Sequence, residues 1–240
     1  MNIKRRTIHE AVLVEETMLA LDVQPGGMYL DGTLGGGPHT EELLRRSSPD
    51  GRVLSLDVDP IALARAGERY FAFGVRWIGV EENFRHLDQA AKANGMTPLD
   101  GVVLDLGLSS DEIADPTKGL SFLRDGPLDM RLGPKANVDG LTAAEIVNSW
   151  DRADVEAILR RFGEEKFAAR IAHNIMEARK NKKIVKTLAL VDIIRASVPA
   201  SYEQGRIHPA TRTFQALRMV VNDELEALRE AVSAAHRVLR

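Results

Sequence analysis

Hydrophobic positions along the first hundred residues form short continuous runs, separated by segments with helical spacing. The runs suit buried strands and lie at residues 28–30, 52–59, 75–80 and from 100 onward. The spacing predicts helices at 8–21, from Pro38, from Pro60 to about 70, and over about 85–94. This alternation of strand and helix predicts an α/β protein with a parallel, doubly wound sheet. Ligands of such sheets bind beyond the carboxyl ends of the strands.

The pattern changes after the fourth predicted strand. Residues 115–140 are too rich in Pro, Gly and Asp for regular structure, yet they contain several large apolar side chains. This composition predicts an ordered loop over a site, in which Asp125, Asp129 and Arg131 bind a substrate or, as we favour, brace the loop. Helical spacing then runs from 142 to about 196, and a last amphipathic helix, from about 214, is predicted through Arg240. The second half therefore predicts a helical insertion rather than more sheet.

A glycine-rich turn follows the first predicted strand. It contains Gly35, Gly36 and Gly37, and Pro38 suits the first position of the next helix. Such a turn is either an ordinary one or the seat of a cofactor. Asp57 favours the seat, because a carboxylate about 20 residues beyond the glycines can accept hydrogen bonds from both ribose hydroxyls. The sequence thus predicts a ligand that contains an adenosine.

The nicotinamide fingerprint G-x-G-x-x-G fits this turn poorly, because Thr40 stands where the third glycine would be. A cofactor without a pyrophosphate is therefore favoured over a nicotinamide cofactor, and an oxidoreductase is the weakest reading. Phe84 and Asp105 also fall at the carboxyl ends of predicted strands, as Asp31 and Asp57 do. We expect either that an adenine stacks on the ring of Phe84 or that this ring is simply part of the core.

Composition and charge limit the classes of protein. The 240 residues are 44% hydrophobic, contain no cysteine and carry a net charge of −3, which predicts a cytosolic globular protein without disulfides or a metal site. No apolar run reaches the roughly 20 residues of a membrane span. Charge is uneven, at −8 over residues 1–150 and +5 over 151–240. Basic side chains of the insertion either track phosphates or form an ordinary solvated surface, and they are Arg160, Arg161, Lys166, Arg170, Arg179, Lys180, Lys182 and Lys183.

Five segments together resemble the RsmH (MraW) family, namely DGTLGGGPHT, DGVVLDLGLSS, GLSFLRDGPLDMRL, GEEKFAARIA and HPATRTFQALRMVVNDELEAL. These are bacterial methyltransferases that use S-adenosylmethionine to modify the N4 amino group of a cytidine in small-subunit ribosomal RNA. The resemblance implies a class I methyltransferase fold with an inserted helical domain. It also implies ribosomal RNA, or the assembled small subunit, as the partner. We expect the cofactor domain at 1–114 and about 214–240, and the RNA-binding loop and helices at 115–213.

The resemblance also assigns cofactor contacts by position, to Gly37, Pro38, His39, Asp57, Phe84, Asp105 and Glu112. Pro38 replaces a glycine of the family pattern and removes a backbone N–H, while Glu112 replaces a glutamine and adds a negative charge. Both changes predict weaker cofactor binding. The family continues beyond residue 240 into further strands, so we expect either a fragment or another cover for the fourth strand, which would otherwise be an exposed edge.

A cytosine amine is a poor nucleophile, so we expect proton acceptors near the fourth strand. The hypothesis is that Asp105, or the hydroxyls of Ser109 and Ser110, orient the amine for direct transfer without a covalent intermediate. Two other readings remain open. One is a methyltransferase that acts on a small molecule or a protein, and the other is an inactive remnant that only binds cofactor or RNA.

Overall fold

The computed structural model describes residues 13–137, 139–203 and 207–240. The chain divides into two compact units. The first, called the sheet unit below, comprises Met1–Asp111 and Leu225–Arg240, and the second, the helical unit, comprises Glu112–Glu224. The helical unit is thus inserted between two segments of the sheet unit.

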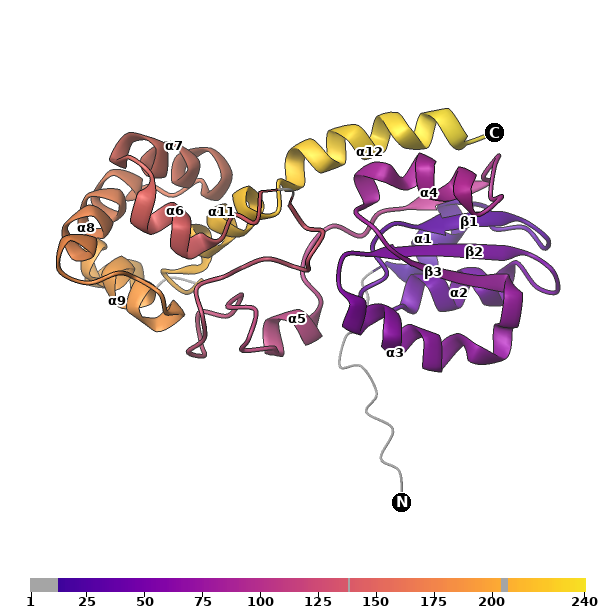
Figure 1. Ribbon diagram of the computed structural model, residues 1–240, viewed down its shortest axis with the longest axis horizontal. Helices are drawn as coiled ribbons and strands as arrows, with labels where there is room; N and C mark the ends of the chain where they lie inside the picture. Colours follow the sequence, from indigo (N-terminus) through magenta and orange to yellow (C-terminus); the bar gives the residue numbers. More distant parts are fainter. Residues whose placement is uncertain (1–12, 138, 204–206) are drawn as a thin grey trace, which may run out of the picture. The chain divides into compact units, whose positions relative to one another are not determined.

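Within the described residues, four parallel strands form one sheet in the order β3-β2-β1-β4 (Figure 1). Their bounds are Met28–Asp31 for β1, Arg52–Asp57 for β2, Trp77–Glu81 for β3 and Gly101–Val103 for β4. The predicted parallel sheet is confirmed, and β4 lies at its edge. β2 and β4 pair with opposite sides of β1, so the order of the strands reverses there. Open sheets bind their ligands at such a point.

Helices cover both faces of the sheet. The sheet unit contains α1 (Val14–Ala20), α2 (Pro38–Arg46), α3 (Pro60–Tyr70), α4 (Leu87–Ala93) and α12 (Glu224–Val238). Side chains alternate along each strand, so Leu30 and Leu54 pack with α4 and α12, whereas Tyr29 and Val53 pack with α1, α2 and α3. Figure 1 shows α4 and α12 on one face of the sheet and α2 and α3 on the other. Residues 8–12 of the first predicted helix lie outside the described residues.

Two predicted segments differ from the structure near the sheet. The third strand begins at Trp77 because Phe71–Arg76 forms a 3₁₀ turn, with Gly74 at φ 56°. The fourth strand ends at Val103, and two residues later Asp105 N–H donates to the Thr33 hydroxyl rather than to a neighbouring strand. The segment after it forms the short helix α5 (Ser110–Ala114).

The helical unit confirms the predicted run of helices. Its elements after α5 are α6 (Ala143–Ser149), α7 (Arg152–Gly163), α8 (Ala168–Asn181), α9 (Thr187–Ser197), α10 (Ala200–Glu203) and α11 (Thr211–Val221). The end of α7 lies close to α11, since a Cβ added at Gly163 would be 2.5 Å from the carbonyl oxygen of Arg212. Only glycine allows this approach of the two helices.

The prediction of one last helix through Arg240 was wrong. The segment forms two helices, α11 and α12, with Asp223 between them at φ 49°. The helical pattern of apolar residues continues across the break, but the side chain of Asn222 forms hydrogen bonds with the loop at 115–140. Its buried side chain accepts from Leu132 N–H at 2.9 Å and donates to the carbonyl oxygen of Met130 at 2.8 Å. Tertiary hydrogen bonds thus end α11 where the sequence pattern does not.

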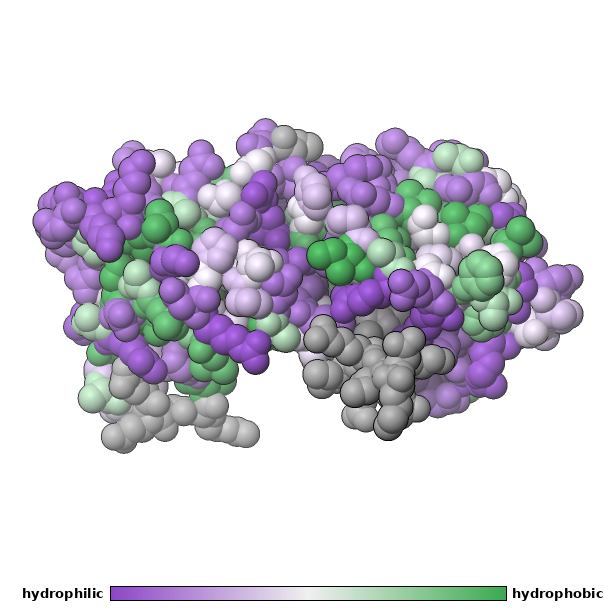
Figure 2. Space-filling model, turned by 60° about the horizontal axis from the view of Figure 1, so that its bottom comes forward, coloured by the Kyte–Doolittle hydropathy of each residue, from purple (hydrophilic) through white to green (hydrophobic). Residues whose placement is uncertain are grey.

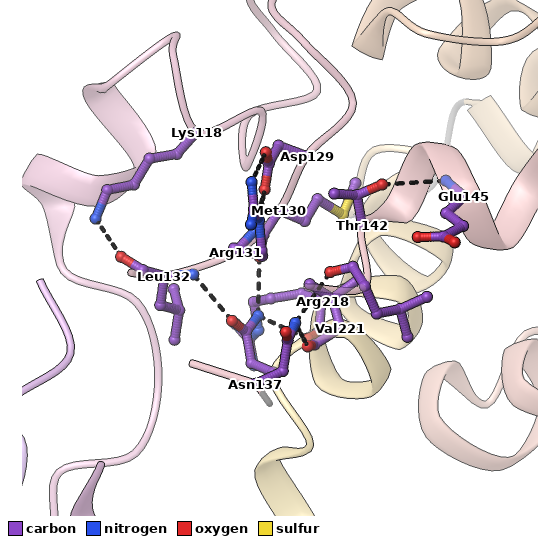
Figure 3. Close-up of polar contacts among 12 residues, drawn as sticks. Lys118, Asp129, Met130, Arg131, Leu132, Asn137, Thr142, Glu145, Arg218 and Val221 are labelled. Atoms are coloured by element: carbon purple, nitrogen blue, oxygen red, sulfur yellow. Dashed lines mark hydrogen bonds and ion pairs between the residues drawn. The ribbon is translucent and has the colours of Figure 1, made fainter. Parts of the chain in front are cut away.

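The loop at 115–140 is an integral part of the helical unit. Figure 3 shows Asn137 beside Val221, to whose carbonyl oxygen it donates at 2.6 Å, and the Lys118 ammonium donating to the carbonyl oxygen of Leu132 at 2.6 Å. Met130 has φ 68°, a conformation that costs a non-glycine residue free energy and is held here by neighbouring bonds. These bonds tie the described part of the loop to the rest of the helical unit.

Asp129 and Arg131 brace this loop. The guanidinium of Arg131 donates from Nε and from Nη2 to the two carboxylate oxygens of Asp129, at 2.8 Å each (Figure 3). This pair holds the pKa of Asp129 below its usual value, although partial burial opposes the shift. Asp125 accepts from the backbone N–H of Leu188 at 3.4 Å. The favoured interpretation, bracing, fits these contacts.

Exposed apolar side chains occur at several places on the surface. In Figure 2 the hydrophobic patches are separated by hydrophilic side chains, and the most exposed of the large apolar residues, Phe71 and Val75, belong to one 3₁₀ turn. Among the residues that the structure describes, none of the helices combines the length and the apolar character that crossing a membrane requires.

We predict that Asn222→Ala destabilises the chain. The substitution leaves Leu132 N–H and the Met130 carbonyl without their partner, which should lower the free energy of unfolding by roughly 2–4 kcal/mol. Urea denaturation measures this, with exposed Asn181→Ala as the matched control, expected to change it by less than about 0.5 kcal/mol. Equal stability of the two variants would show that Asn222 does not fix the loop.

Candidate functional site

A buried carboxylate organises the carboxyl edge of the sheet. Asp31, at the end of β1, is 1% exposed. It accepts from Thr33 N–H at 3.1 Å and from the Thr40 hydroxyl at 2.7 Å. Thr40 and Ser55 share a hydrogen bond of 2.8 Å, and Trp77 Nε1 donates to the Ser55 hydroxyl at 3.0 Å. One polar chain thus connects β1, α2, β2 and β3.

Burial raises the pKa of Asp31, because loss of hydration disfavours the ionised carboxylate. The hydrogen bonds from Thr40 and Thr33 and the nearby His39 act in the opposite direction and limit the shift, whereas the charge of Asp105 adds to it. Asp31 is therefore a buried residue with a structural role at the carboxyl edge of the sheet.

The glycine turn is tied to the end of β2 through Asp57. Gly35 N–H donates to Oδ2 of Asp57 at 2.8 Å, and Asp59 N–H donates to Oδ1 at 2.8 Å. Leu34 N–H extends the connection by donating to the Leu56 carbonyl at 3.0 Å. Each carboxylate oxygen of Asp57 thus accepts from a backbone N–H, and these bonds orient the side chain at the end of β2. The position of Asp57 beside the glycines agrees with its predicted place.

Gly37 is required by the packing at the start of α2. It caps the helix at φ 86°, and a Cβ there would lie 2.2 Å from the Tyr70 hydroxyl oxygen. That hydroxyl donates to the Gly37 carbonyl at 2.5 Å, and burial raises the pKa of Tyr70. Pro38 occupies the start of the helix, as predicted. At Gly36, the carbonyl oxygen accepts from the Arg69 guanidinium at 2.9 Å.

Asp105 lies at the same edge as Asp57 and is more accessible than Ser109 and Ser110, the other proposed acceptors near β4. Its backbone N–H donates to the Thr33 hydroxyl at 2.7 Å. Its side chain is 46% exposed, and Oδ2 lies 3.7 Å from Nδ1 of His39, whose side chain is 5% exposed. The carboxylate therefore faces a buried imidazole on one side and is open to a ligand on the other.

The remaining predicted residues lie at different distances from this edge. Ser109 is near the glycine turn, with its Cβ 3.8 Å from where a Cβ on Gly35 would be, and Ser110 begins α5. Phe84 is half-buried and packs against the core on the α4 side of the sheet, so it is partly a core residue. Glu112 is the first residue of the helical unit, whereas Asp111, paired with Arg65 at 2.8 Å, belongs to the sheet unit.

Sequence reasoning missed the two threonines that hold this edge together. From the sequence, Thr40 was interpreted only as the residue in place of the third glycine of the nicotinamide fingerprint, and Thr33 was assigned no role. A usable signal was Ser55, a polar residue on the α2 face of an apolar strand, which implies a buried polar partner. Within the described residues, no three His, Asp or Glu side chains gather as metal ligands would.

Comparison with known proteins matches residues 6–240 to the family model described as the MraW methylase family. A protein of Symbiobacterium thermophilum named ribosomal RNA small subunit methyltransferase H is 47% identical over 97% of this chain and 72% of its own length. A protein of the same name from Geotalea daltonii is 45% identical over 97% of this chain and 73% of its own length.

Solved structures give a weaker likeness. The crystal structure of an rRNA methylase from Streptococcus thermophilus aligns with a TM-score of 0.34 at 22% identity, covering 42% of this chain and 57% of the other. A SAM-dependent O-methyltransferase from Thermotoga maritima aligns with a TM-score of 0.31 at 22% identity, covering 36% and 33%.

We predict that Asp31→Asn alters how stability depends on pH. In unfolded chains an aspartate has a pKa of about 3.9, and in the folded chain burial raises it. Between these two values the native state binds more protons, so the contribution of Asp31 is full at low pH and is lost as pH rises through the folded pKa. The asparagine does not titrate, so the stability of the variant relative to wild type should increase as the pH rises above about 4.

Thermal unfolding across this pH range measures the difference, and exposed Asp50→Asn is the matched loss of one carboxylate. A difference between Asp31→Asn and wild type that shrinks with rising pH would mean that the Asp31 carboxylate is not held in an unfavourable buried state.

Proposed function

Since this chain belongs to the MraW methylase family, we propose that it transfers a methyl group from S-adenosylmethionine to the N4 amino group of a cytidine in small-subunit ribosomal RNA. The observation that carries the proposal is the carboxyl edge of the sheet, where the glycine turn, Asp57 and Asp105 come together. The names of the curated relatives, ribosomal RNA small subunit methyltransferase H, support the substrate.

The donor set of this edge fits the cofactor. Asp57 ends β2 beside the glycine turn, where it accepts from Gly35 N–H, and a carboxylate at the end of this strand is the type of group that accepts from a ribose diol. The sheet unit contains 14 Lys and Arg against 19 Asp and Glu, so its field favours a cation. When bound, S-adenosylmethionine supplies an electrophilic methyl group on a positively charged sulfur. We propose Gly35, Gly36, Gly37, Pro38 and His39 as the backbone of the seat, with Asp57, Phe84, Asp105 and Glu112 as further contacts.

Asp105 is our candidate for orienting the amine. The lone pair of a cytosine amine is delocalised into the ring, so the reaction gains from acceptors that fix its N–H groups and take a proton. The Asp105 carboxylate is half-exposed, and the Thr33 hydroxyl fixes its backbone at 2.7 Å. The hydroxyls of Ser109 and Ser110 are the alternative acceptors. Precise placement of this kind contributes much of the rate of a direct transfer.

The helical unit is proposed to bind the RNA around the target base. A base inside a duplex or a stack must be extruded before its amine can be methylated. The protein must therefore also bind the phosphates on either side of the target base. At its structural bounds the unit contains 18 Lys and Arg against 16 Asp and Glu. The helical unit is therefore less basic than residues 151–240 taken alone. Binding of phosphates by this unit therefore depends on local clusters of basic side chains.

Transfer of a labelled methyl group tests the function. The substrate is small ribosomal subunits that lack the cytidine N4 methyl group, and wild type should label their RNA at a cytidine. Asp57→Ala removes the predicted ribose acceptor and frees Gly35 N–H, so it should weaken cofactor binding, measured by calorimetry, by about 100-fold. A folded wild-type chain that binds the cofactor yet labels no RNA would contradict the proposal and favour a binding protein without turnover.

Asp105→Asn tests the chemistry in the same assay. It keeps the backbone bond to Thr33 and removes the carboxylate, so kcat should fall by about 100-fold or more, the usual effect of losing a proton acceptor. Ser109→Ala is the comparison for the hydroxyl alternative. Wild-type turnover in both variants, with normal cofactor binding, would mean that neither group orients the amine.

A further inference from the structure

Basic residues of the helical unit are concentrated in one stretch of the chain. Residues 160–186 contain nine Lys or Arg and three Asp or Glu. The remainder of the unit is accordingly acidic, since the unit as a whole has 18 basic and 16 acidic side chains. An RNA contact made by this unit through phosphates is therefore to be sought within residues 160–186.

Several of these side chains are already engaged within the protein. Arg160 pairs with Glu156 at 2.8 Å, and Lys180 pairs with Glu177 at 2.6 Å. The Arg179 guanidinium donates to the carbonyl oxygen of Trp150 at 2.7 Å. A phosphate would have to replace these partners, which reduces what each contact contributes to binding.

Three lysines differ from them. Lys182, Lys183 and Lys186 are exposed, and none of their ammonium groups makes an ion pair with any residue the structure describes. They lie between α8 and α9 on a backbone that is extended at both ends, with φ −154° and ψ 136° at Lys182 and φ −127° and ψ 145° at Lys186. We call Lys182, Lys183 and Lys186 the lysine strip.

Hydrogen bonds with neighbouring segments fix the backbone of the lysine strip. Ile184, in its middle, is 3% exposed. Asn148 holds Ile184 from both sides, accepting from its N–H at 2.9 Å and donating to its carbonyl oxygen at 2.8 Å. Lys186 pairs as an antiparallel bridge with Pro127. Binding therefore orders only the lysine side chains, and the backbone loses little entropy.

Apolar side chains lie beside these charges. Val185 is 49% exposed within the lysine strip, Leu188 follows at 38%, and Leu123 is 73% exposed. Leu123 is close in space, because the carbonyl oxygen of its neighbour Arg124 accepts from the Thr187 hydroxyl at 2.8 Å. Cations interleaved with apolar groups suit a polyanion that also presents sugars and bases, more than a simple anion.

We propose that the lysine strip is a contact surface for the phosphate backbone of the RNA substrate. The inference rests on the proposed function, which supplies the partner. It assigns binding of the RNA phosphates to three residues of the helical unit. The ammonium groups neutralise phosphates and release their counterions, so the lysine strip contributes affinity without reading sequence.

The test is RNA binding as a function of salt. The variant K182Q/K183Q/K186Q is compared with wild type for binding to small ribosomal subunits and to naked small-subunit rRNA. Three lost phosphate contacts should lower affinity for both probes by about 10-fold or more at about 0.1 M salt. The slope of log affinity against log salt should become shallower by about 2.

Two control variants define the result. R45Q/K92Q/R229Q removes three ion-paired cations of the sheet unit and the same net charge, and it should change affinity by less than about threefold. K182R/K183R/K186R keeps the charges and should keep the affinity and the slope. Together with the loss in the glutamine variant, these results would support the proposal.

Four outcomes would overturn it. They are an unchanged slope in the glutamine variant, an equal loss in the sheet-unit control, a loss in the arginine variant, and a loss confined to assembled subunits, which would indicate a protein partner. If wild type itself binds neither probe, the proposed function fails and takes this inference with it. Failure of the lysine strip alone leaves RNA binding and methyl transfer by wild type intact.

Discussion

The hydrogen bonds of the buried Asp31 carboxylate fix the geometry on which the site depends. One oxygen holds Thr33 N–H, and the Thr33 hydroxyl in turn holds the backbone of Asp105. The other oxygen holds Thr40, which continues the chain to Ser55 in β2. An unpaired polar group at this depth would cost several times what its hydrogen bond returns, so these bonds are strongly favoured together. Asp31 thus links the strands, the turn and the proposed catalytic carboxylate.

Asp57 and Asp105, two of the acidic residues proposed to contact ligands, are held differently. Asp57 receives N–H groups from Gly35 and Asp59, which orient both of its oxygens at the end of β2. Asp105 is fixed through its backbone, and its side chain is half-exposed. A carboxylate oriented by N–H donors suits recognition of a fixed diol, whereas an accessible one suits contact with an incoming base. These differences support the proposed roles of Asp57 at the ribose and of Asp105 at the amine.

Much of this was predictable from the sequence, and the failures have a common cause. Buried strands, the glycine turn and the proline at the start of α2 are local features, set by apolar runs and by backbone conformation. The break between α11 and α12 was missed because the apolar period continues through Asn222, whose hydrogen bonds to residues about ninety positions earlier end the helix. Likewise, no pattern reveals that Thr33 serves Asp105.

Charge was the least predictable property of the candidate RNA surface. The sequence lists Arg160 and Lys183 as equivalent basic residues, but the structure pairs Arg160 with Glu156 and leaves Lys183 exposed on an anchored turn. Pairing depends on which side chains share a helix face, and accessibility depends on Asn148 and Ile184 beneath the turn. Net charge over a segment therefore overstated what the insertion offers to phosphates.

If the proposed cofactor seat is preformed, these backbone bonds exist before S-adenosylmethionine binds. Amide hydrogen exchange of the full chain, with and without S-adenosylmethionine, tests this most directly. A preformed seat predicts slow exchange at Gly35, Asp59 and Asp105 in the absence of the cofactor, and slower exchange around the glycine turn when it is added. Rapid exchange at these three amides in the absence of the cofactor, or no response to it, would contradict a preformed seat.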